Sequence, residues 1–71
     1  MSGRPEKHSL TLNGHRTSVS LEADFWAAFR DLATARGVTL NTLAAEIDAG
    51  RGDVGLASAI RVVVLRALRA E

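Results

Sequence analysis

The sequence feature that most constrains the fold is a short alternating run at residues 16–21, which leads directly into an amphipathic helical pattern. Its apolar and β-branched side chains occupy one side of a period-two strand, and its polar side chains occupy the other. An isolated strand cannot satisfy its own backbone N–H and C=O groups, and no later segment has the pattern of a second strand. The strand must therefore pair with residues 8–12 or with another copy of the chain.

Residues 8–12 form a second alternating run, and Asn13-Gly14 separates it from the first. Asn-Gly between two such runs is a strong hairpin signal, because both residues tolerate the positive φ of a type I′ turn. The resulting register pairs Leu12 with His15, Leu10 with Thr17 and His8 with Val19. It gathers the apolar side chains of both runs on one face, so the two patterns agree on an amphipathic hairpin.

Three helices are expected after the hairpin. The first should cover residues 22–36 and end at Gly37, and Thr39 should cap a second helix that stops near Gly50. A third should cover about residues 56–69, after a glycine-rich turn with Asp53 or Gly55 near its N-cap. The apolar stripes predicted for the first two helices comprise Phe25, Ala28, Phe29, Leu32, Leu40, Leu43, Ala44 and Ile47. Trp26 is expected at the edge of the core or at a subunit interface, in preference to a ligand-stacking role.

The third helix is apolar on more than one side. Its main apolar side comprises Ile60, Val63, Val64, Ala67 and Leu68. Val62 and Leu65 fall on the opposite side, which suggests that a partner subunit covers them. Arg61, Arg66 and Arg69 are expected to be solvated or paired with Glu46 or Asp48.

Composition favours an oligomer. A chain of 71 residues is one small domain, in the size range where a monomeric core is marginal. It has no cysteine and two histidines, so disulfides are excluded and no metal site is expected. Oligomerisation is the remaining way to stabilise the fold.

Charge and hydropathy indicate which partners and which cellular location to expect. The net charge of +1 permits a nucleic-acid partner without requiring one. Residues 1–7 lack periodicity and are expected to form a flexible basic arm that carries Arg4 and Lys7, with residues 8–71 as the folded domain. No apolar run is long enough for a signal peptide or a transmembrane helix, so we expect a cytoplasmic protein without a membrane partner.

The sequence does not predict an enzyme. A nucleophile needs a base within hydrogen-bond reach, and the hairpin register sets His8 and His15 at opposite ends of their strands. Glu22, Asp24 and Asp31 are more simply explained as helix-start and surface charges than as an acid/base pair. We therefore expect no catalytic residues and no cofactor.

Several motifs together resemble the ribbon-helix-helix family of bacterial DNA-binding regulators. They are Arg-Thr-Ser-Val-Ser-Leu-Glu at residues 16–22, the Phe25-Trp26 pair, and Arg-Gly-Val-Thr-Leu-Asn at residues 36–41. Residues 12–22, Leu-Ala-Ala-Glu-Ile-Asp at 43–48 and Ser-Ala-Ile-Arg at 58–61 are similar to a compact group of short bacterial proteins with this domain. The resemblance covers about residues 8–69. It implies a mostly α fold with a short N-terminal hairpin or ribbon and a third helix, in an intertwined homodimer whose strands 16–21 pair antiparallel.

The resemblance also implies which residues contact DNA. The base-reading side chains would be Arg16, Ser18 and Ser20. The phosphate contacts would be the backbone of Thr39, Leu40 and Asn41, with Arg4 and Lys7 from the arm. The dimer core would comprise Val19, Leu21, Phe25, Phe29, Leu43, Ile47, Ile60 and Val64.

Two features depart from the family pattern. Of the three base-reading side chains, only Arg16 can make a bidentate base contact, so specificity would be low or would depend on DNA shape and on the N-terminal arm. Two hairpins side by side would form a four-stranded sheet, with strand gaps of about 4.8 Å, which is wider than the major groove of roughly 12 Å. The DNA-bound form is therefore expected to release strand 8–12.

The resulting hypothesis is a homodimer that binds double-stranded DNA as a transcriptional regulator or an antitoxin-like repressor. The alternative is a dimeric protein-interaction module that does not bind DNA. Such a module would dock another protein through its polar sheet face or its third helix.

Overall fold

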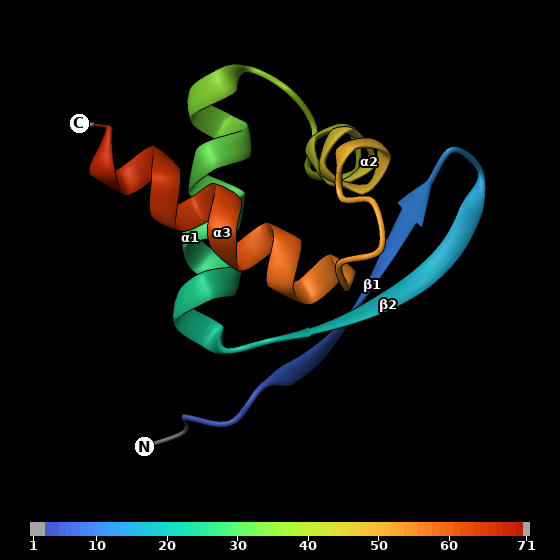
Figure 1. Cartoon of the computed structure of the whole chain (residues 1–71), viewed down its shortest axis with the longest axis horizontal. Helices are drawn as coiled ribbons and strands as arrows, with labels where there is room; N and C mark the ends of the chain where they lie inside the picture. The colour runs from blue at the N-terminus through green and yellow to red at the C-terminus, as the bar shows by residue number, and fades with distance from the viewer. Residues whose placement is uncertain (1–2, 71) are drawn as a thin grey trace.

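A computed structural model describes residues 3–70, and in it a β-hairpin precedes three helices (Figure 1). The strands are β1 (Glu6–Leu12) and β2 (His15–Leu21), and the helices are α1 (Ala23–Arg36), α2 (Leu40–Gly50) and α3 (Leu56–Arg69). This order confirms the predicted mostly α fold with an N-terminal hairpin. Residues 1, 2 and 71, which the sequence assigned to the arm and to the end of the domain, lie outside the described residues.

The hairpin has the predicted turn and register. Asn13 and Gly14 have φ values of 52° and 83°, as a type I′ turn requires. The strands pair in register from Leu12 opposite His15 to Glu6 opposite Leu21. β1 begins two residues earlier than expected, so Glu6 and Lys7 belong to the strand and not to a flexible arm.

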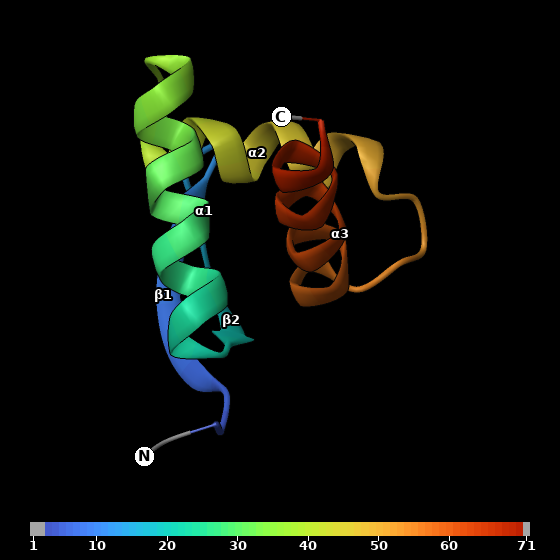
Figure 2. The same ribbon diagram turned by 90° about the vertical axis from the view of Figure 1, so that its left-hand side faces the viewer.

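All three helices lie on the same side of the hairpin, and no described element covers its other side (Figures 1 and 2). The covered side carries Leu10, Leu12, Val19 and Leu21, which are all buried. These side chains join Phe29, Ala33, Leu43, Ala44, Ile47, Ile60 and Val64 in a single hydrophobic cluster. β1 and β2 therefore form one wall of the core.

The residues expected in a dimer core are already buried within one copy, apart from Phe25, which is half-buried. A single chain thus supplies its own core. Leu68 was expected on the main apolar side of α3, but it is 60% exposed, because it lines an open hollow between α1 and the last turns of α3. Val62 and Leu65 are also exposed, at 43% and 51%.

The helix ends follow from local sequence. Gly37 ends α1 in the left-handed conformation with φ 70°, which a residue without Cβ adopts at little cost. Thr39 caps α2 by accepting a hydrogen bond from the backbone N–H of Thr42 at 3.0 Å. Gly55 is the N-cap of α3.

Trp26 lies half-buried at the edge of the core, and its ring stacks on the His8 ring with centroids 3.8 Å apart.

An ion pair joins α3 to the point where β2 leads into α1. The Arg61 Nε donates a hydrogen bond to Glu22 Oε1 at 3.0 Å, and Arg61 Nη2 lies 2.9 Å from the same carboxylate oxygen. The guanidinium carbon lies 5.8 Å from the centre of the Phe25 ring. The expectation that Arg61 is solvated or pairs with Glu46 or Asp48 is therefore wrong. Glu22 lies closer once α3 folds back onto β2, and Asp48 pairs instead with Arg51, three residues further along the chain.

Leu10→Ala tests whether β1 is part of the core. The Leu10 side chain is 2% exposed, so its truncation should reduce the free energy of unfolding by about 2–5 kcal/mol, measured by urea denaturation. Ser9→Ala, on the exposed face of the same strand, is the matched control and should change it by less than about 0.5 kcal/mol. Equal effects of the two substitutions would show that β1 does not pack on the helices.

The Glu22–Arg61 pair predicts a pH dependence of stability. A backbone N–H hydrogen bond, and then the Arg61 guanidinium, lower the pKa of Glu22 below its usual 4.5. A lowered folded-state pKa gives stability that is present above the unfolded pKa and is lost as the pH falls through the folded value.

Glu22→Gln should therefore reduce stability at pH 7, and the difference from the unmodified protein should shrink below about pH 4.5. Chemical denaturation between pH 7 and pH 3 measures the free energy of unfolding of both proteins. Glu46→Gln, at an exposed α2 position, is the control. If the difference in free energy of unfolding between Glu22→Gln and the unmodified protein stays constant with pH, the ion pair does not contribute to stability as proposed.

Candidate nucleic-acid interface

The uncovered side of the hairpin is a continuous polar face. It consists of Lys7, Ser9, Thr11, Arg16, Ser18 and Ser20, all exposed. The register sets Thr11 opposite Arg16, Ser9 opposite Ser18 and Lys7 opposite Ser20. This polar face carries two cations and no carboxylate, and successive side chains on each strand lie about 6.6–6.8 Å apart. Its electrostatics suit an anionic partner.

The three predicted base-reading side chains lie in a row along β2. Within residues 3–70, the side chains of Arg16, Ser18 and Ser20 make no hydrogen bond or ion pair. The Arg16 guanidinium can donate two parallel hydrogen bonds to a guanine edge or to a phosphate, whereas a serine hydroxyl can pair with any base. The face can therefore make one specific contact and several permissive ones per chain.

The outer edge of β2 is not paired with another strand within the described residues. A two-residue loop is flanked by a hydrogen-bonded pair, so the backbone groups of Arg16, Ser18 and Ser20 point away from β1. Within residues 3–70, the one hydrogen bond to the backbone at this edge comes from Arg61 Nη2, which donates to the Ser20 carbonyl at 3.4 Å. Another strand could therefore add to this edge by replacing a single long hydrogen bond.

The N-terminus of α2 lies beside the turn end of β1. Asn41 Oδ1 accepts a hydrogen bond from the Thr11 N–H at 3.1 Å. Because Thr11 lies opposite Arg16, this contact brings the first turn of α2 close to the end of the polar face that carries Arg16. The N–H groups of Leu40 and Asn41 precede the first intrahelical hydrogen bond, so they are available to an anion.

Sequence reasoning assigned only backbone contacts to Asn41 and missed this side-chain role. Thr11 belongs to a pair whose N–H groups point away from the partner strand, so its N–H needs another acceptor or water. Asn41 supplies it across 30 residues of sequence. No local pattern identifies such a contact, because it depends on how α2 packs against β1.

The remaining predicted contacts have separate positions. Arg4 is exposed and lies just before β1, and Lys7 lies within β1 on the polar face. His8 and His15 lie at opposite ends of the hairpin, as expected. The described residues contain no group of three potential metal ligands, and none of their helices has the length and hydropathy to cross a membrane.

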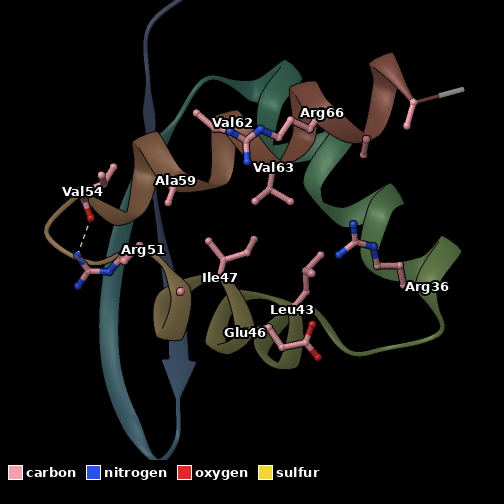
Figure 3. Close-up of a pocket in the computed structure, with 13 residues that line it drawn as sticks. Arg36, Leu43, Glu46, Ile47, Arg51, Val54, Ala59, Val62, Val63 and Arg66 are labelled. Carbon is pink, nitrogen blue, oxygen red and sulfur yellow. Dashed lines mark hydrogen bonds between the residues drawn. The ribbon is translucent and has the colours of Figure 1, made fainter.

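A second surface lies between α2 and α3 (Figure 3). It is a groove whose apolar floor includes Leu43, Ile47 and Val63, and its rim carries charged side chains. The rim residues are Arg36, Arg51 and Arg66 with Glu46. Arg51 is engaged by Asp48 and by the Val54 carbonyl, at 2.6 and 2.7 Å. The groove is thus apolar inside and basic at its edge.

Comparison with known proteins identifies the family. A family model described as a ribbon-helix-helix domain matches residues 5–68. Searches of curated proteins and of solved structures returned no significant match. Ribbon-helix-helix domains are in general DNA-binding transcription regulators. From its hairpin, its helices and a match that covers nearly its whole length, this chain belongs to the ribbon-helix-helix domain family.

Proposed function

We propose that this protein is a homodimer that binds double-stranded DNA through the polar face of its hairpin and regulates transcription, as a simple regulator or an antitoxin-like repressor. The observation that carries the proposal is the row of Arg16, Ser18 and Ser20 on β2. The three side chains are exposed and make no hydrogen bond or ion pair within the described residues, and the Arg16 end of the row lies close to the N-terminus of α2. Such a role requires a compartment that contains DNA, which fits a cytoplasmic location.

Each part of the interface would have a separate task. Arg16 would read a guanine edge, and the serines would contact bases with little discrimination. The free N–H groups at the start of α2 would hold a phosphate and fix the orientation of the protein on the duplex. With one discriminating side chain per subunit, much of the specificity would come from the shape of the DNA and from the spacing of two half-sites.

Dimerisation would use the outer edge of β2. Two β2 strands can pair antiparallel around Ser18, so that the Ser20 carbonyl accepts from the partner's Arg16 N–H in place of Arg61. The exposed Val62 and Leu65 of α3 supply apolar surface that a second subunit can cover. A symmetric dimer would present two copies of Arg16 to the duplex.

The groove between α2 and α3 favours a second candidate function, a protein-interaction module. Its basic rim and apolar floor would suit an amphipathic helix that carries carboxylates on its flanks. In that case Arg66 would be the sensitive position, and the polar face of the hairpin would have no ligand.

Arg16→Ala distinguishes the two functions. It should weaken specific DNA binding by roughly 1–3 kcal/mol, measured by fluorescence anisotropy in a salt titration, because it removes the bidentate contact. Arg30→Ala, at an exposed position of α1, is the matched control and should leave affinity unchanged. If the intact protein shows no affinity for duplex DNA even at low salt, the regulator function is excluded.

Sedimentation equilibrium at micromolar concentration should give twice the chain mass of 7.6 kDa. Ser18→Pro should dissociate the dimer, because it removes an N–H that points out of β2 and leaves the ladder to β1 intact. Ser9→Pro removes the equivalent N–H on the outer edge of β1 and should leave the dimer intact. A folded monomer at all concentrations would contradict the proposed pairing.

A further inference from the structure

We propose that β1 remains paired with β2 when the protein binds DNA, and that Lys7, Ser9 and Thr11 contact the phosphates along the edges of the groove. This inference rests on the proposed function. It replaces the expectation that strand 8–12 is released in the complex, and it makes the interface the face of a four-stranded sheet.

Three contacts hold β1 in place. Leu10 and Leu12 are 2% and 8% exposed and belong to the same cluster as Phe29, so release of β1 would expose both to water. The His8 ring stacks on Trp26 with an angle of 2° between the ring planes. The Asn41 side chain holds the Thr11 N–H. All three contacts are lost together if β1 leaves.

The width of a four-stranded sheet places β1 over the phosphates. When two β2 strands pair at the centre, the three gaps between the four strands span roughly 14 Å, since each gap is about 4.8 Å. The major groove is about 12 Å wide. The central β2 pair therefore faces the base edges, and the two β1 strands lie at the walls of the groove, where the sugar-phosphate backbones run.

The side chains of β1 have the chemistry of phosphate contacts. Lys7 offers an ammonium, and Ser9 and Thr11 offer hydroxyl donors, all three exposed and on the same face as Arg16. Thr11 also adjoins the start of α2 through Asn41, so the donors of β1 continue into the helix N–H groups. This row neutralises phosphate charge and carries no base information, so it should raise affinity equally for all sequences.

A cross-strand disulfide tests whether β1 stays in place. Ser9 and Ser18 are directly opposite in a pair whose side chains approach closely, and the chain has no other cysteine. The double variant Ser9→Cys with Ser18→Cys, oxidised and purified as the species crosslinked within one chain, should bind duplex DNA within about threefold of its reduced form. The reduced form is the control for loss of the two serines. If oxidation abolishes binding and reduction restores it, β1 must leave and the inference is overturned.

Charge substitutions test the phosphate contacts. Ser9→Asp should weaken binding to specific and random duplexes alike by at least about tenfold, and Lys7→Ala should reduce the slope of log affinity against log salt by about 1. Ser58→Asp, at an exposed position of α3, should change neither. Circular dichroism checks that all variants fold.

If Arg16→Ala weakens binding but the two β1 substitutions do not, the inference fails and the proposed function stands. If the intact protein does not bind DNA, both fail.

Discussion

Burial of the apolar face of the hairpin is the constraint on which the rest of the structure depends. Leu10, Leu12, Val19 and Leu21 come from only two strands, yet they complete a core whose other members come from three helices. At roughly 1.5–3 kcal/mol for each side chain, their burial is comparable to the whole stability of about 5–15 kcal/mol of a typical domain. The polar side chains of the hairpin point to solvent because the apolar side chains on its opposite face are packed in the core.

This constraint explains why the hairpin, and not a lone ribbon, is the functional unit. A strand with one buried face has a fixed register, because a slip by one residue would bring Ser9 and Ser18 into the core. The same packing fixes which backbone groups point outward, and thus which edge is available to a second copy. The alternation of apolar and polar residues along the two strands therefore determines which side chains face a ligand. It also determines which edge faces a partner.

Local patterns were sufficient to predict the elements, and the helix ends fell where Gly37, Thr39 and Gly55 indicated. The hairpin register followed from Asn13-Gly14, because a two-residue loop leaves no freedom in the pairing. Contacts between distant segments were not predictable in this way. Arg61 pairs with Glu22 across 39 residues, and Asn41 reaches Thr11 across 30, so both depend on helix packing that no short pattern encodes. The start of β1 at Glu6 was missed because Glu6 and Lys7 are both charged and show no alternation.

The stack of His8 on Trp26 gives the protein a built-in optical reporter. Trp26 is the sole tryptophan of the chain, and its ring lies in contact with a side chain of β1 while its backbone belongs to α1. Any movement that lifts β1 from α1 would replace an imidazole by water at the indole face. The tryptophan fluorescence of the unmodified protein would therefore report whether β1 is packed against α1 in solution. It would do so without a label, both in free protein and in protein bound to DNA.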